Sequence, residues 1–363
     1  MKLHRTLFAT LSFFFLISPF LFLQSAHAID NKNIVLLEPP HRDLNGVFLD
    51  DELTLSLLPT GRLGQLIFSP SAQPRTWLID AALIEDVEAM ALENIAAQNW
   101  LSELKYITAQ DPVIALPYGH PDISLTTRLA PTELRYYFDV SKTRLQVALG
   151  REVSIKRTVK WGANSVKVPA DTVRSYTLNR REIALMSTVV PPAELDTLRS
   201  KLAYLLAPGL NKERQLFFAH NANEALAIQR HKLRIVSGKY RLTSEKEKVP
   251  ITLVNDFNVP LTVDLQLRPL NSRIQVSDIK GVTLDAKSKT QLSVPITVVA
   301  SGTTAVLAQF VNSHSRPIND AVLLSLSISV ISPTVAWFTT GAAILLFLAA
   351  LTQSVRRIRR SRK

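Results

Sequence analysis

The sequence predicts an α/β domain, followed by an all-β, immunoglobulin-like sandwich and a single transmembrane helix at the C-terminus. Up to about residue 230, short apolar runs alternate with stretches of helical periodicity, which favours a parallel sheet covered by helices. From about residue 231 the helical periodicity is replaced by short runs in which apolar and polar residues alternate. Residues 333–355 carry no charge and are long enough to cross a hydrocarbon core of about 30 Å.

The two ends of the chain predict its topology. Lys2 and Arg5 precede an apolar run over 7–23 and the small-x-small pattern of residues 26–28, so we expect a signal peptide (1–28) cleaved after Ala28, with a retained signal anchor as the alternative. At the other end, a basic tail (356–363) follows the apolar segment and indicates the cytoplasmic side. The residues expected at the membrane interface are Trp337, Phe338, Arg356, Arg357, Arg359 and Arg360. This topology predicts a single-pass protein of the cell membrane whose residues 29–332 lie outside the cytoplasm.

The charge and the absence of cysteine narrow the class of protein. The formal net charge is +12, of which the tail contributes +6 and the leader +2, leaving +4 for the rest of the chain. Because the basic excess is concentrated beside the membrane segment, it favours contact with the lipid bilayer over nucleic acid binding. With no cysteine, the exported part folds without disulfides. No cofactor is expected.

The α/β domain (29–230) is predicted to contain five strand–helix units. Because a closed barrel of this kind needs eight, we expect either a shortened barrel or an open parallel sheet. Gly61 and Gly64 interrupt the pattern between the first two strands. The first predicted helix is capped by Asp50 or Asp51 and holds Leu53, Leu57 and Leu58. The predicted strands are 34–37, 76–80, 113–116, 158–161 and 183–186, and the further predicted helices are 81–92, 95–104, 132–149, 169–178 and 191–205.

The β-sandwich (231–332) is predicted to contain seven strands. These are 233–236, 249–254, 261–267, 273–276, 291–298, 305–311 and 321–329. Residues 255–258, of sequence Asn-Asp-Phe-Asn, have the composition of a hairpin turn and are interpreted as structural.

Polar side chains follow two of the predicted parallel strands, where ligand sites of α/β domains gather. Asp80 ends one strand, and the next is followed by a loop that contains Tyr118, His120 and Asp122. Asp80, His120 and Asp122 are candidate catalytic residues, because two carboxylates can perform acid–base chemistry on a sugar and Asp with His can bind a metal. A single Asp before a helix is more often a cap, so we favour capping roles for Asp80 and Asp122.

Two further groups of residues have both a functional and a structural interpretation. His41, Asp43 and the acidic run 50–52 follow the first strand and could line a polar cleft, although a solvated loop is favoured. No paired metal-ligand spacing and no nucleophile elbow occur, and no metal site is predicted. Of the aromatic residues, Trp77 and Trp100 are assigned to the core, while Tyr118 and Trp161 are candidate ligand contacts.

Several segments together resemble a known family. The chain resembles actinobacterial membrane-anchored proteins of unknown function that are usually encoded beside the flippase for lipid II, the peptidoglycan precursor. Relative to that family the present chain is shortened between about residues 125 and 230. The matching segments are HRDLNGVFLDDEL (41–53), GRLGQL (61–66), TWLIDAALIEDV (76–87), VIALPYGHPDISL (113–125) and VPITLVNDFNVPLTV (249–263). The resemblance implies a role in the cell envelope near cell-wall synthesis and no established reaction.

These observations favour a non-enzymatic binding or accessory protein linked to peptidoglycan assembly. Its expected partners are the bilayer and either peptidoglycan or a membrane protein of cell-wall synthesis. The alternative is a divergent carbohydrate-active hydrolase or deacetylase that acts on a wall glycan. No Leu-Pro-x-Thr-Gly motif precedes Pro333, so retention in the membrane is predicted over sorting to the wall.

Overall fold

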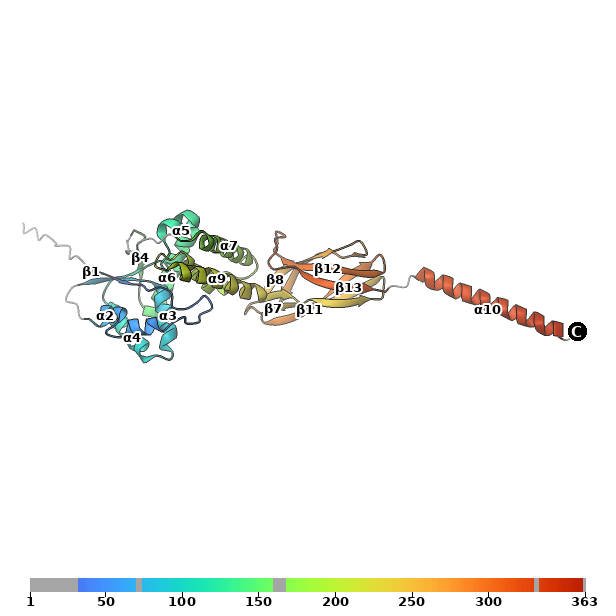
Figure 1. The fold of residues 1–363 in the computed structure, drawn as a ribbon, viewed down its shortest axis with the longest axis horizontal. Helices are drawn as coiled ribbons and strands as arrows, with labels where there is room; N and C mark the ends of the chain where they lie inside the picture. The colour runs from blue at the N-terminus through green and yellow to red at the C-terminus, as the bar shows by residue number, and fades with distance from the viewer. Residues whose placement is uncertain (1–31, 70–73, 159–167, 330–332, 362–363) are drawn as a thin grey trace, which may run out of the picture.

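The structure is a computed structural model that describes residues 32–69, 74–158, 168–329 and 333–361. An α/β head, a β-sandwich and a long helix follow one another along the molecule (Figure 1). The predicted signal peptide (1–28) and Trp161 lie outside the described residues. The predicted succession of an α/β part and an all-β part is confirmed.

The head is built on a four-stranded parallel sheet with the strands in chain order. The middle strand is buried on both of its faces. Trp77 and Ile79 belong to the main core, which includes the helices, whereas Leu78 packs with Ile114 and Leu116 on the other face. The strands are β1 (Lys32–Leu36), β2 (Arg75–Ile79), β3 (Val113–Ala115) and β4 (Ser154–Ile155). In the described residues β1 and β4 are the two edges, so of the two predicted arrangements the sheet is the open one.

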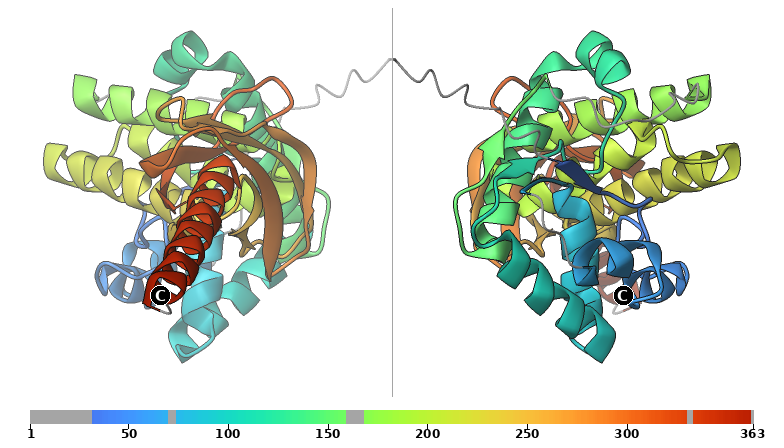
Figure 2. Two further views of the ribbon diagram at one scale, coloured as in Figure 1. Left: turned by 90° about the vertical axis from the view of Figure 1, so that its right-hand side faces the viewer. Right: turned by 90° about the vertical axis from the view of Figure 1, so that its left-hand side faces the viewer.

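The helices of the head lie in two groups. Figure 1 shows α2 and α4 below β1, and α7 and α9 at the end of the head nearer the sandwich; in both views of Figure 2 the blue helices lie below the yellow-green ones. The helices are α1 (Glu52–Leu57), α2 (Arg62–Phe68), α3 (Ala81–Ala91), α4 (Ile95–Thr108), α5 (Ile123–Leu129), α6 (Pro131–Leu149), α7 (Ala170–Met186), α8 (Pro192–Lys201), the 3₁₀ helix η1 (Leu202–Leu206) and α9 (Lys212–His231).

Three local predictions in the head require correction. Residues 183–186 are the end of α7 and not a strand; Ile183 and Met186 are buried three residues apart, as on one face of a helix. The strand predicted over 158–161 is replaced by β4 at Ser154–Ile155, and residues 159–161 lie outside the described residues.

Gly64 does not interrupt a helix but lies inside α2, where a Cβ atom would come within 1.8 Å of the Leu58 carbonyl oxygen. Glycine therefore allows α2 to pack closely on the end of α1.

The sandwich consists of a five-stranded and a four-stranded sheet. Within both sheets all neighbouring strands are antiparallel except β6 and β13. The first sheet has the order β10-β8-β12-β13-β6, from β6 (Gly238–Leu242), β8 (Leu261–Pro269), β10 (Ile279–Leu284), β12 (Gly302–Val311) and β13 (Val322–Ile328). The second has the order β5-β7-β11-β9, from β5 (Leu233–Ile235), β7 (Lys246–Asn255), β9 (Ile274–Gln275) and β11 (Ser288–Val298). The seven predicted strands are present, and β6 and β10 were missed.

The segment 255–258, predicted as a hairpin turn, is a link between the two sheets. β7 belongs to one sheet and β8 to the other, so the strands that flank the segment do not pair. The buried Asn255 side chain holds this link: its Nδ2 donates to the carbonyl oxygens of Val259 (2.9 Å) and Asp285 (2.9 Å), and its Oδ1 accepts from the Phe257 amide (3.0 Å). A structural role is therefore confirmed, although the turn type was wrong.

Replacing Asn255 with alanine should lower the free energy of unfolding by about 2–4 kcal/mol, because it leaves buried backbone groups without partners. Urea denaturation of the full chain measures the effect. The matched control is Asn258→Ala on the same link, where the side chain is exposed and should matter by less than about 0.5 kcal/mol. Equal effects of the two changes would contradict the role assigned to Asn255.

The C-terminal segment is one helix, α10 (Pro333–Ser361). Its apolar side chains are open to the surroundings, with Trp337 82% exposed and Phe347 65% exposed. Across the described part of the chain, no helix has both the length and the apolar character of a membrane span. The span predicted over 333–355 thus receives no support from the structure. The side chains of Phe338 and of Arg356, Arg357, Arg359 and Arg360 lie outside the description.

Candidate functional site

Asp80 and His120, both predicted from the sequence as site residues, meet at the carboxyl edge of the parallel sheet. Asp80 Oδ2 lies 2.9 Å from His120 Nδ1, and Asp80 Oδ1 accepts hydrogen bonds from the amides of Ala82 (2.9 Å) and Gly119 (3.0 Å). Asp80 is 1% and His120 4% exposed. Both oxygens of the carboxylate are therefore used inside the protein.

The loop that Asp80 binds has an unusual backbone. His120 has a φ of 37° and Gly119 a φ of 67°, in the left-handed region that a side chain with a Cβ disfavours. A Cβ atom on Gly119 would lie 2.7 Å from Cδ1 of Tyr204, so the loop also packs tightly from the other side. The Asp80 carboxylate offsets the cost of this conformation by accepting two hydrogen bonds from the loop.

Asp122 belongs to a separate interaction. Its Oδ1 accepts from the Leu125 amide (2.7 Å) and caps α5, just as Asp80 caps α3. The capping roles favoured for both residues are confirmed. In the described residues no hydrogen bond or ion pair joins Asp122 to Asp80 or His120, so the three candidates do not form one polar constellation.

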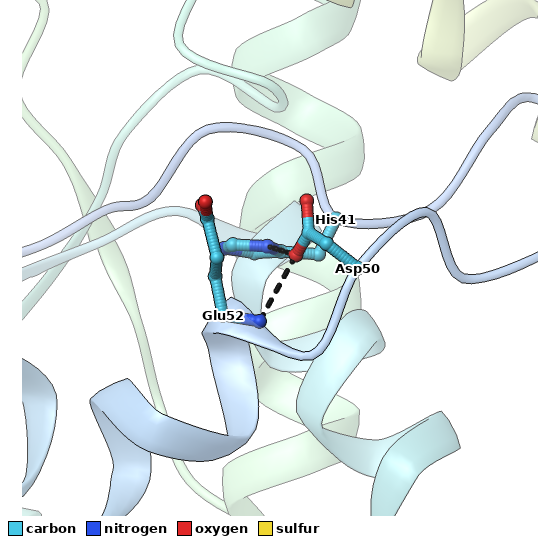
Figure 3. Close-up of side chains that lie close together, drawn as sticks. All are labelled: His41, Asp50 and Glu52. Carbon is cyan, nitrogen blue, oxygen red and sulfur yellow. Dashed lines mark hydrogen bonds and ion pairs between the residues drawn. The ribbon is translucent and has the colours of Figure 1, made fainter.

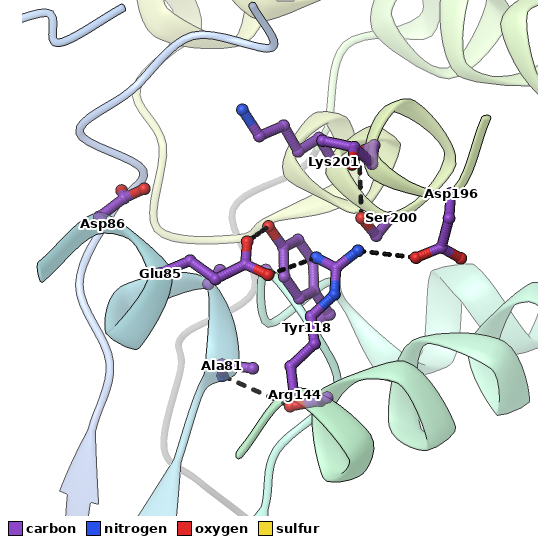
Figure 4. Close-up of polar contacts among 12 residues, drawn as sticks. Ala81, Glu85, Asp86, Tyr118, Arg144, Asp196, Ser200 and Lys201 are labelled. Carbon is purple, nitrogen blue, oxygen red and sulfur yellow. Dashed lines mark hydrogen bonds and ion pairs between the residues drawn. The ribbon is translucent and has the colours of Figure 1, made fainter. Parts of the chain in front are cut away.

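Tyr118 is fully buried rather than open to a ligand. Its hydroxyl donates to Glu85 Oε2 (2.6 Å), and its ring stacks on Tyr204 with 6.0 Å between centroids. The Arg144 guanidinium lies 4.7 Å from the same ring (Figure 4). Burial, together with the Glu85 charge, raises the pKa of Tyr118 well above its ordinary value. The predicted core positions of Trp77 and Trp100 are confirmed, since both are 0% exposed.

Arg144 organises a polar network that the sequence did not reveal. Its guanidinium lies 2.7 Å from Glu85 and 2.8 Å from Asp196, which connects α6 to α3 and α8 (Figure 4). Glu85 and Arg144 also line a groove of about 250 Å³ between α3 and α6, together with Ala81, Ile84, Glu88, Thr143, Leu145, Val147 and Ala148. Partial burial raises the pKa of Glu88, and the neighbouring Glu85 charge adds to the shift. The groove combines an ion pair with an apolar wall.

A second set of charges is buried deeper in the head. Arg42 Nε lies 2.7 Å from Asp86 Oδ1, and Lys201 Nζ donates to the carbonyl oxygens of Asp43 (3.0 Å) and Leu44 (3.3 Å). Burial raises the pKa of Asp86 and lowers that of Lys201. These contacts fasten the segment after β1 to the rest of the head.

The segment that contains His41 and Asp43 is therefore not the solvated loop that the sequence favours. His41 is 3% and Asp43 9% exposed. His41 Nδ1 lies 2.9 Å from Asp50 Oδ1 (Figure 3). Partial burial alone would raise the pKa of Asp50, but hydrogen bonds from His41, the Glu52 amide and Arg214 lower it overall.

These features define a two-part protein with an open parallel α/β head, a polar groove on the head and a β-sandwich. Residues 163–363 match the model of a family described as "Family of unknown function (DUF6049)". This match covers more than half of the chain, and the chain belongs to that family. No curated protein matches the sequence.

Solved structures show only distant similarity. WR4, a Caenorhabditis elegans MSP family member, has 10% identity and a TM-score of 0.21, covering 27% of this chain and 97% of its own. A PapD-like domain of human CEP192 has 14% identity and a TM-score of 0.21, covering 28% and 85%. The Pseudomonas fluorescens alkylpurine DNA glycosylase AlkC bound to DNA has 13% identity and a TM-score of 0.19, covering 78% and 84%. The comparisons establish a family whose function is unknown, and no activity.

Proposed function

We propose that this protein is a non-catalytic accessory protein of an actinobacterial cell envelope, in which the head binds peptidoglycan or a membrane protein of cell-wall synthesis. The observation that carries the proposal is the burial and the internal hydrogen bonding of Asp80 and His120. Both side chains are buried, and Asp80 uses each of its oxygens to hold the protein's own backbone and His120. A catalytic carboxylate or base instead has to reach a substrate atom within hydrogen-bond distance.

The proposed location is the cell membrane, with the head and sandwich outside the cytoplasm. It is supported by the leader pattern of residues 1–28 and by the apolar segment with its basic tail. The head and α10 lie at opposite ends of the molecule, with the sandwich between them (Figure 1). In this proposal the sandwich is a spacer that presents the head to the wall.

The proposed binding surface is the groove between α3 and α6. Its lining offers the Glu85–Arg144 ion pair for polar recognition and the exposed Val147 with the half-buried Ala148 for apolar contact. A peptidoglycan fragment has the matching mixture of polar and apolar groups. Concave sites that combine apolar walls with a few placed polar groups are the usual form of small-ligand sites.

A hydrolase or deacetylase acting on a wall glycan is the second candidate. One observation favours it: Glu88, whose pKa is raised, lies in the same groove as Glu85. A carboxyl group whose pKa is raised can serve as a general acid beside a second carboxylate. This candidate therefore moves from Asp80, His120 and Asp122 to Glu85 and Glu88.

Co-sedimentation of the purified full chain with isolated peptidoglycan tests the proposal. The substitution Thr143→Trp, at an exposed position in the groove, should fill it and weaken binding by at least about fivefold. Thr197→Trp, at an exposed position of α8, is the matched control and should leave binding unchanged. Cell fractionation should place the protein in the membrane.

Two results would overturn the proposal. Release of sugar or acetate from the glycan, lost in Glu88→Gln, would establish the enzyme instead. Recovery of the protein in washed wall or in the soluble fraction would contradict the membrane anchor.

A further inference from the structure

His41, Asp50 and Glu52 gather in a small cluster at the start of α1. One ring nitrogen of His41 and one carboxylate oxygen from each of the two acids lie within 4.8 Å of one another (Figure 3). The three residues come from a short stretch of chain, and none of them lines the groove between α3 and α6. Acidic residues near a helix start are common, so the cluster by itself indicates nothing about a ligand.

The His41 ring supplies an independent observation. The residue is 3% exposed, and among the described residues its Nε2 atom has no hydrogen-bond partner. Buried polar atoms almost always have a partner, and each exception calls for an explanation. Figure 3 shows the ring between the two acids, with one edge on Asp50 and its far end toward the Glu52 side chain.

Asp50 determines which nitrogen of His41 carries the proton. Its Oδ1 lies 2.9 Å from Nδ1, and since a carboxylate only accepts, Nδ1 carries the hydrogen in neutral His41. The Nε2 atom then presents a lone pair. An imidazole oriented by a carboxylate through its other nitrogen is the usual arrangement of a metal-binding histidine.

The two carboxylates of the cluster differ in their surroundings. Asp50 is engaged, because it pairs with His41 and Arg214 and accepts from the Glu52 amide (3.1 Å). The Glu52 side chain is exposed and makes no hydrogen bond or ion pair with the described residues. Arg214 balances Asp50, so Glu52 contributes an uncompensated negative charge beside the Nε2 lone pair.

We propose that this cluster binds a divalent transition-metal ion of the zinc type. His41 Nε2 and the Glu52 carboxylate are the protein ligands, water completes the coordination, and Asp50 is a positioning residue that acts through His41. A nitrogen ligand with a carboxylate suits zinc or cobalt, whereas magnesium and calcium prefer oxygen ligands alone. The proposal does not depend on the proposed function of the groove.

Titration of the full chain with Zn²⁺ and Co²⁺ tests the site. The exposed pair His220 and Glu224, one helical turn apart with 3.2 Å between Nε2 and Oε1, is a second place where a metal could bind. All proteins therefore carry His220→Ala. We expect one equivalent of metal to bind and to raise the melting temperature, while Mg²⁺ and Ca²⁺ have no effect. X-ray absorption of the zinc form should show one imidazole nitrogen in the coordination shell.

The variants separate the site from non-specific binding. Glu52→Gln should weaken Zn²⁺ binding by at least about tenfold, and Asp50→Asn by about 10–100-fold. Asp51→Asn, which removes one neighbouring exposed charge, should leave the affinity unchanged. Because Glu52 is exposed, its substitution should not unfold the protein, which the melting temperature without metal checks. Absence of Zn²⁺ binding, or equal affinities of the Glu52→Gln and Asp51→Asn proteins, would overturn the proposal.

Discussion

Replacing Asp80 with alanine is expected to lower the free energy of unfolding by about 3–5 kcal/mol, one of the largest effects of any single change in this chain. The change removes one buried acceptor that serves three donors: the amides of Ala82 and Gly119 and the ring of His120. Two of these donors belong to a loop with positive φ angles, which loses the contact that holds it. Urea denaturation of the full chain, followed by tryptophan fluorescence, measures the loss.

Asp122→Ala is the matched control for this prediction. Asp122 also caps a helix, but among the described residues its carboxylate accepts one hydrogen bond, from the Leu125 amide. Loss of one cap should cost about 1 kcal/mol. If Asp80→Ala unfolded with the same midpoint as the parent and the variant lost only binding or activity, Asp80 would be a functional residue and its structural assignment would be wrong.

The parts of the fold that the sequence predicts well are those with a local signal. The strands β2 and β3 are short and apolar, and each is followed by an Asp or a turn. The N-caps of α3 and α5 could be predicted because Asp80 and Asp122 stand directly before these helices. The sandwich strands show alternation because only one face of each sheet is buried, as in β7, where Val249 and Ile251 are buried and Pro250 is exposed.

Elements without an apolar stripe could not be predicted in this way. The sequence did not predict the long helix α9, because five of the seven residues on its buried face are small or polar: Gln215, Ala219, Asn221, Ala222 and Ala225, beside Phe218 and Leu226. A helix that buries alanine and amide side chains has little contrast between its faces. At the end of α7, the sequence predicts a strand over residues 183–186, because a short apolar run fits either a strand or a helix.

The sites of the head depend on contacts between distant residues. The His41 amide donates to Asp86, 45 residues away, and Leu44 donates to Asn221, 177 residues away. Hydrogen bonds between residues so far apart in the chain cannot be predicted from the spacing of residues in the sequence. Charged side chains are normally assigned to the surface, and for that reason the burial of His41 and Asp86 was not anticipated.

Arg42→Met should destabilise the fold by about 3–5 kcal/mol near pH 7, because it leaves the Asp86 carboxylate buried without its cation. Asp86 is 2% exposed, and Arg42 Nε at 2.7 Å is its ion-pair partner. Methionine retains most of the apolar length of the side chain, so the change mainly removes charge. The matched control is Arg157→Met: Arg157 and Asp139 form an exposed pair 3.9 Å apart, which should contribute less than about 0.5 kcal/mol.

The pH dependence distinguishes loss of the charge partner from loss of packing. Burial already holds the pKa of Asp86 above its ordinary value, and removal of Arg42 should raise it further. A carboxyl whose pKa is raised by folding favours the folded state when protonated, and ionisation costs stability as the pH rises above about 4. The difference in unfolding free energy between parent and Arg42→Met should therefore shrink as the pH is lowered from about 7 toward 4. A difference that stayed constant over this range would show that Arg42 stabilises the head through packing or its bond to the Glu85 carbonyl oxygen, and not through the charge of Asp86.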